Sequence, residues 1–190
     1  MSRTPTVARL TALLLVAPAV AMAQHDMSAM GHDAKHELGV DLGIVYAKPS
    51  GGDGVIQIGT PVDVRIGFVS SGKLEVEPRF AFSYASGGGN NAYSFRPDVN
   101  LLFGLGADKN KKGPYVTVGA GVDLTHLKIS GAGSASASQF SINGGIGTRA
   151  PYESGAFRLE AFTRYLFKNT SKGLPNTLDI GARIGLSLWH

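Results

Sequence analysis

Polar and apolar residues alternate along eight stretches of this chain. The stretches predict strands at about 37–47, 55–69, 74–85, 93–106, 114–127, 139–149, 156–168 and 177–189. Because successive side chains of a strand point to opposite faces, each predicted strand has one apolar and one polar face. Short and long connections alternate between the strands, as expected when hairpins join neighbours. The pattern therefore predicts an all-β fold of eight antiparallel strands in up-and-down order.

The polar faces of these strands carry the charge. They hold seven arginines and eight acids: Asp41, Asp63, Arg65, Glu75, Glu77, Arg79, Arg96, Asp98, Asp123, Arg149, Arg158, Glu160, Arg164, Asp179 and Arg183. A soluble, lipocalin-like barrel is the alternative, but it would have to bury the arginines or expose the apolar faces to water. The alternation is instead typical of an eight-stranded transmembrane β-barrel that is apolar toward lipid and polar toward its lumen.

Strand length and number agree with a membrane barrel. A tilted strand needs about 9–11 residues to cross a bilayer, and an even number of strands allows an antiparallel sheet to close without unpaired edges in lipid. Pro61, Pro78 and Pro97 each remove a backbone donor from a strand. We therefore expect bulges or strand ends near these prolines.

The N-terminal segment has a different composition. Residues 1–23 carry Arg3 and Arg9, an apolar run and the small-x-small sequence of residues 21–23, which together predict a signal peptide. Residues 24–36 predict a disordered periplasmic tail, and residues 37–190 form the barrel. Removing Arg3 and Arg9 from the 18 basic residues leaves 16 against 14 acids, which gives no reason to expect nucleic-acid binding. The chain contains no cysteine.

The inward charges predict a packed network of ion pairs. Isolated buried charges are costly, and the planar guanidinium fork can bond a carboxylate twice. Lysines are confined to turns, loops and strand ends, whereas inward glycines leave room for long side chains in a narrow lumen. The network favours a structural interior; proton transfer or ion conduction by the carboxylates is the alternative.

Two further groups of residues suggest chemistry. His126 is the one candidate base outside the termini, with Ser130 and Asp123 near it in sequence, but no motif surrounds it, so we expect no enzyme. The tail contains soft and borderline metal ligands, which could bind copper: His25, Met27, Met30, His32 and His36. A polar linker without metal is the alternative, and no other cofactor is expected.

Aromatic residues of the apolar faces gather toward strand ends. Tyr46, Tyr84, Tyr93, Phe140, Tyr165 and Phe167 lie toward the longer loops, and Phe68, Phe103 and Phe157 toward the shorter turns. This placement predicts two interfacial girdles.

The alternating region resembles the small eight-stranded outer-membrane barrels of the OmpA/OmpX type. The resemblance covers residues 37–190 and rests on the pattern; the chain departs from it at Trp189 and His190, because the C-terminal aromatic residue is penultimate. It implies a monomer in the outer membrane, with membrane lipid and the barrel assembly machinery as partners. It also implies a structural or surface-interaction role, with a narrow porin-like channel as the alternative and a lipid-modifying enzyme as a less expected one.

Overall fold

Eight strands form the whole of the folded region. The computed structural model describes residues 36–71, 73–87, 90–106, 112–131 and 133–189. The strands are β1 (His36–Pro49), β2 (Val55–Ser71), β3 (Leu74–Gly87), β4 (Asn90–Gly104), β5 (Gly113–Ile129), β6 (Gly133–Tyr152), β7 (Gly155–Leu166) and β8 (Thr177–Trp189). A short 3₁₀ helix, Thr170–Lys172, lies between β7 and β8. Among the described residues, no helix is both long and apolar enough to cross a membrane.

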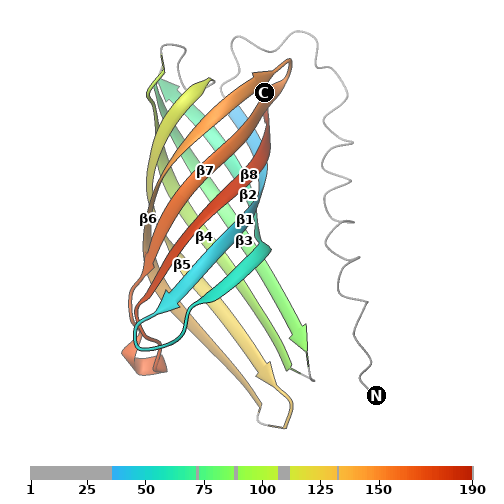
Figure 1. The fold of residues 1–190 in the computed structure, drawn as a ribbon, viewed down its shortest axis with the longest axis vertical. Helices are drawn as coiled ribbons and strands as arrows, with labels where there is room; N and C mark the ends of the chain where they lie inside the picture. Colours follow the sequence, from blue (N-terminus) through green and yellow to red (C-terminus); the bar gives the residue numbers. More distant parts are fainter. Residues whose placement is uncertain (1–35, 72, 88–89, 107–111, 132, 190) are drawn as a thin grey trace.

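The strands close into a barrel in sequence order. Each strand pairs antiparallel with its neighbours, and β1 pairs with β8 from Glu37↔Trp189 to Pro49↔Thr177. Figure 1 shows the strands inclined to the long axis of the barrel. The end that holds the start of β1, the end of β8 and the turn between β6 and β7 is called here the turn end. The opposite end, with the hairpins at 49–55, 87–90 and 129–133, is called the loop end. The predicted fold class is confirmed.

The barrel is apolar outside and charged inside. The most exposed large apolar side chains include Ile58 at 73% and Ile56 at 66%, whereas Arg65, Glu75 and Glu77 are each 0% exposed. The burial string of β7 alternates without interruption from Ala156 to Leu166. A fold that exposes its aliphatic residues and buries its arginines is stable only when the surroundings are apolar. The inward and outward faces are those that the sequence predicts.

Six strands, β1 to β6, are longer than the sequence predicts, and β6 is extended the most. The sequence predicts the sixth strand from about residue 139, which leaves the Gly/Ala/Ser residues before it in a loop, but β6 begins at Gly133 and its first residues pair with Leu124–Ile129 of β5. That expectation is wrong because small residues carry no alternation, although their backbones pair as well as any others. β4 likewise begins at Asn90, which shortens the expected loop. His36, placed by the sequence in the tail, is the first residue of β1.

A ladder is interrupted near each of the three prolines, but among these places the register changes only near Pro61. Between β1 and β2 the register changes from Leu42↔Val62 to Ile44↔Ile58, so residues 59–61, with Pro61, oppose Gly43. Between β4 and β5 the register is the same at Phe95↔Leu124 and at Asp98↔Gly121, but Arg96 and Pro97 do not pair with β5. Between β2 and β3 the register is likewise unchanged on either side of Pro78, but Pro78 does not pair with β2. These irregularities are expected where proline cannot donate to the ladder.

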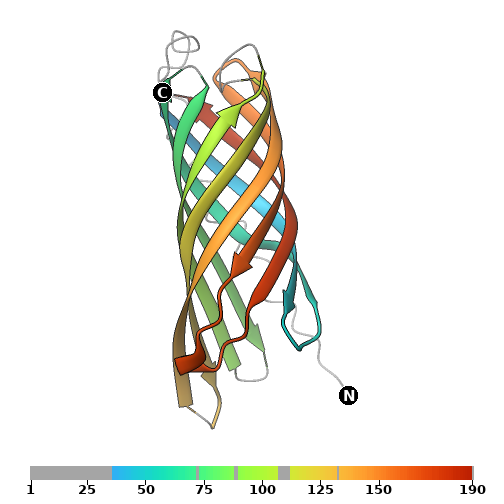
Figure 2. The same ribbon diagram turned by 90° about the vertical axis from the view of Figure 1, so that its left-hand side faces the viewer.

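The wall of the barrel is uneven at the loop end. β2 and β3 pair only as far as Val62↔Phe82, so residues 55–61 and 83–87 continue without pairing to each other. Figure 2 shows the β1–β2 hairpin diverging there from the β3–β4 hairpin.

Candidate functional site: the charged interior

Eleven inward side chains form one continuous set of ion pairs, called here the main network. It joins six carboxylates to five arginines: Glu37, Asp41, Asp63, Glu75, Glu77, Glu160, Arg65, Arg79, Arg149, Arg158 and Arg183. Six of the eight strands, all but β4 and β5, contribute to this set through side chains that are at most 7% exposed. Ten of the fifteen predicted interior residues belong to it.

Arg65 of β2 has the most diverse partners in the main network. Its Nε donates to Asp41 at 2.8 Å, and its Nη1 lies 3.4 Å from Glu77 and bonds Glu37. Its Nη2 donates to the Ser187 hydroxyl at 2.7 Å and to the Leu186 carbonyl at 3.3 Å. The guanidinium therefore ties β2 to β1, β3 and β8, across the place where the first and last strands close the barrel.

Glu160 of β7 is the most heavily bonded acceptor. Both of its oxygens accept from Arg79 at 3.0 Å in a bidentate pair, and Oε2 also accepts from Arg158 at 3.0 Å and from the Tyr115 hydroxyl at 2.8 Å. Arg158 extends the contact to Glu77, with 2.5 Å between its Nη1 and the Glu77 Oε2. These hydrogen bonds cross the lumen between strands on opposite sides of the barrel. The side chains therefore fill the lumen and link its opposite walls.

The other five predicted residues form two smaller sets nearer the loop end. Arg164 donates to Asp98 at 2.9 Å. Arg96 lies 2.6 Å from Asp123 and 3.9 Å from Asp179. The Arg96 side chain is 15% exposed, more than any other interior arginine with a recorded ion pair. The interior is therefore densest at its middle and turn end.

Sequence reasoning missed two important members of the interior. Glu37, at the start of β1, is 2% exposed and bonds Arg65, Arg149 at 2.9 Å and Arg158 at 3.5 Å. The sequence did contain a signal for Glu37: it lies an even number of positions before Asp41, so both side chains lie on the inward face of β1. Tyr115 was missed because tyrosine occurs on both faces; it is 1% exposed, and the Arg158 guanidinium lies 4.9 Å from its ring centre.

The space for these long side chains comes from glycine. A Cβ added at Gly39 would lie 2.2 Å from the Arg65 Cζ, and one at Gly147 would lie 2.4 Å from the Tyr115 Cζ. One added at Gly185 would lie 1.7 Å from an Asp41 oxygen. The guanidinium, phenol and carboxylate groups thus lie directly against bare backbone, so these positions have no room for a larger residue.

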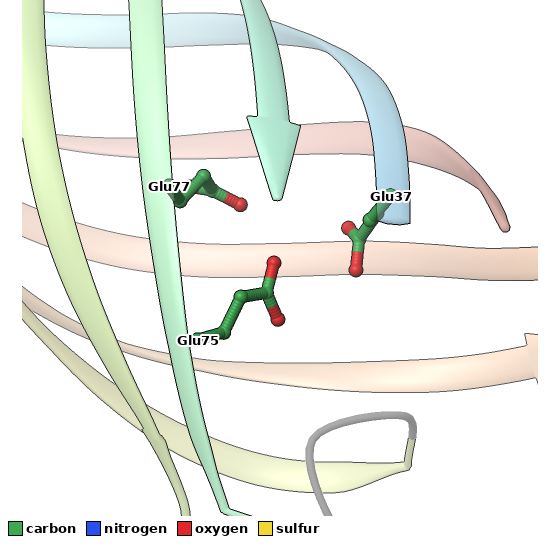
Figure 3. Close-up of side chains that lie close together, drawn as sticks. All are labelled: Glu37, Glu75 and Glu77. Carbon is green, nitrogen blue, oxygen red and sulfur yellow. The ribbon is translucent and has the colours of Figure 1, made fainter. Parts of the chain in front are cut away.

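Three carboxylates of the main network could resemble a metal site. Oxygens of Glu37, Glu75 and Glu77 lie within 4.8 Å of one another, and Figure 3 shows the three side chains turned toward a common space. Their oxygens already accept bonds from Arg65, Arg79, Arg149 and Arg158. The positive charge at this place is therefore supplied by guanidinium groups, and a divalent cation would be repelled by four of them. These residues do not fit a metal site.

The candidate catalytic residues are not assembled as a triad. His126 bonds Ser136 through Nδ1 at 2.7 Å, whereas the backbone nitrogen of Ser130 bonds Asn90. Asp123 faces the lumen and contacts Arg96. No carboxylate among the described residues contacts His126, so the group that would orient a catalytic imidazole is missing from this part of the chain.

The predicted copper ligands lie almost entirely outside the described residues. Of His25, Met27, Met30, His32 and His36, only His36 is described. Its ring packs edge-on against Phe68 with 5.4 Å between ring centres.

The fold, but not the sequence, is similar to known structures. The sequence matches no protein-family model and no curated protein. The structure of Neisserial surface protein A is similar at a TM-score of 0.57 and 12% identity, covering 83% of this chain and 98% of that one. The attachment invasion locus protein Ail of Yersinia pestis is similar at 0.54 and 13%, with the same coverage. A further Ail structure, in complex with the heparin analogue sucrose octasulfate, has a TM-score of 0.51 at 12% identity.

These similarities establish the architecture. The chain has the fold of the small eight-stranded outer-membrane barrels, and the resemblance inferred from its alternating strands is confirmed at the level of fold.

Proposed function

We propose that this chain is an integral outer-membrane barrel whose interior is a sealed structural core and whose activity lies at its loop-end surface. The observation that carries the proposal is the main network, whose arginines and carboxylates bond across the lumen instead of lining an open bore. An eight-stranded lumen is only about wide enough for side chains to fill it. The apolar belt outside supports lipid as the surrounding medium.

The membrane location has a direct test. The full chain, expressed with its N-terminal segment in a Gram-negative host, should fractionate with the outer membrane and resist extraction by carbonate. It should also migrate faster in unheated than in heated SDS samples, because a closed barrel resists unfolding by the detergent. A carbonate-soluble chain with one mobility would contradict the proposal.

A narrow channel is the second candidate, and one observation favours it. The interior holds nine carboxylates, counting Glu37, against seven arginines, and single oxygens of Asp41, Asp63 and Glu75 have no hydrogen-bond partner among the described residues. A surplus of carboxylates could attract small cations. Cation-selective current through reconstituted protein would establish this function in place of the sealed core.

We propose no catalytic role. The described residues around His126 lack an orienting carboxylate, as given above. Mass spectrometry of the host's lipid A should accordingly show the same acyl chains with and without the protein. A change in acylation that disappears in Ser136→Ala would contradict this part of the proposal.

A further inference from the structure

The outward face of β4, β5 and β6 changes character where these strands reach the loop end. Two cross-strand rows lie there side by side: Tyr93–His126–Ser136 and Asn91–Lys128–Ser134. These six residues are called here the outer tip. The β5–β6 hairpin that carries four of them extends furthest from the turn end (Figure 1).

The outer tip borders the apolar belt. The adjoining row is Phe95–Leu124–Ser138, in which Phe95 is 40% and Leu124 43% exposed, and Phe140 on β6 is 53% exposed. The change from aliphatic and aromatic residues to Tyr, His, Lys and Ser thus occurs within one row. This order is expected where a barrel passes from lipid tails to the layer of lipid headgroups.

The polar groups of the outer tip are arranged to donate. The Tyr93 ring stacks on the His126 ring with 4.9 Å between centres and 23° between planes. The bond from Nδ1 to Ser136 at 2.7 Å fixes the other side of the imidazole. The Nε2 of His126 and the ammonium of Lys128 have no partner among the described residues.

No acid balances these groups. The acids described at the loop end are Asp53, in the β1–β2 hairpin, and Asp123 and Asp179, which are buried in the lumen. Lysines at that end are Lys48, Lys128, Lys168 and Lys172. The loop-end surface is therefore positive, and Lys128 is the one described lysine that lies on the strands of the outer tip.

We infer that the outer tip binds the phosphorylated headgroup of a lipid in the surrounding outer leaflet. A phosphate takes charge-assisted hydrogen bonds from an ammonium and from imidazole and hydroxyl donors, and tyrosine is favoured at the headgroup level. A membrane lipid is favoured over a soluble anion because the site faces sideways, directly next to the lipid-facing belt. The inference rests on the proposed location in the outer membrane.

The test compares two lipids and two double variants. The full chain is reconstituted in phosphatidylcholine nanodiscs with either diphosphorylated lipid A or its dephosphorylated form, and lipids that remain bound are quantified by native mass spectrometry. The site variant is Lys128→Gln with His126→Gln. The control variant is Lys48→Gln with Lys168→Gln, which changes the end of β1 and the segment after β7 and removes the same number of basic groups outside the outer tip.

The wild type and the control variant should retain the diphosphorylated lipid in preference to the dephosphorylated one. The site variant should lose this preference by about fivefold or more, since one basic side chain near a charged lipid surface changes binding by about that factor. If both variants lose this lipid preference equally, the lipid is held by the overall positive charge of the loop end and not by the outer tip, and the inference is overturned. Equal retention of both lipids by the wild type would overturn it too.

A soluble source of phosphate and a failure of insertion give separate results. If inorganic phosphate binds the detergent-folded protein as tightly as the lipid does, and the site variant abolishes this binding, the assignment to a membrane lipid is overturned. A protein that does not insert, judged by digestion of its strands with added protease, contradicts the proposed function. An inserted protein without phosphate preference contradicts only the present inference.

Discussion

Arg65→Met should be among the most destabilising single changes in this barrel. The substitution keeps much of the side-chain volume but removes the guanidinium from five partners, among them Asp41, Glu37 and Glu77. Among the described residues, Arg65 is the one cation within ion-pair distance of Asp41, and Asp41 is 1% exposed. In this part of the chain the variant therefore leaves a buried carboxylate without a direct ion pair.

The size of the destabilisation depends on which ion pairs the carboxylates keep in the variant. Glu37 keeps Arg149 at 2.9 Å, and Glu77 keeps Arg79 and Arg158 at 2.5 Å, so their losses are partly offset. Asp41 has no such substitute. Breaking a buried pair by removing one partner costs about 3–5 kcal/mol, and we expect the free energy of unfolding to fall by this amount. Lys48→Gln, at an exposed ammonium that bonds the Gly52 carbonyl, should cost less than about 1 kcal/mol.

Urea unfolding in lipid vesicles measures both values. Trp189 is the only tryptophan and pairs with Glu37 between β8 and β1, so its fluorescence reports opening of the closing seam. The double variant Arg65→Met with Asp41→Asn removes the stranded charge and should recover about 1–3 kcal/mol of the loss. If Arg65→Met costs no more than Lys48→Gln, or if the second change recovers nothing, water reaches this site and the account of a dry network is refuted.

Three other predictions concern orientation, packing and the tail. A cysteine placed at Ser130 should react with an impermeant reagent on intact cells and one at Glu153 should not, because the short turns and both termini of an even barrel face the periplasm; the reverse labelling would invert the orientation. Gly39→Ala should lower the free energy of unfolding by about 1–3 kcal/mol, since its Cβ would lie 2.2 Å from a guanidinium carbon, whereas Gly144→Ala, with its nearest neighbour at 3.5 Å, should cost little; equal effects in urea unfolding would argue against close packing. If residues 24–36 bind copper, the full chain should bind copper more weakly below a pH of about 6.5, and His25→Ala should weaken copper binding further. If calorimetry shows the same copper binding for the wild type and His25→Ala, residues 24–36 are a linker and not a metal site.

The faces of the strands could be predicted because alternation is a local property. Arg158 and Glu160 lie between apolar neighbours in β7, and their inward orientation follows from the period of two alone. The number of strands and their order follow from the same pattern and from the turns between them. The predicted ends of the strands were wrong where polar and apolar residues do not alternate, as at the Gly/Ala/Ser start of β6.

The partners inside the barrel could not be predicted in the same way. Arg79 bonds Glu160, which is 81 residues away in sequence, because the inclination of the strands and their stagger around the barrel place β3 opposite β7 at that height. That stagger depends on irregularities such as the one around residues 59–61, whose size no local pattern gives. The sequence therefore predicted most of the interior residues, without Glu37 and Tyr115, but not which of them pair.

The seal of the lumen is tested most directly by current through single barrels in a planar bilayer. Folded wild-type protein, inserted in a membrane of neutral lipid, should show no stepwise openings above the bare bilayer, because guanidinium and carboxylate groups bond across the interior from Glu37 to Glu160. Insertion is established in the same preparation by resistance of the strands to protease. Regular, reproducible conductance steps from the inserted wild type would contradict a sealed interior and establish the channel in its place.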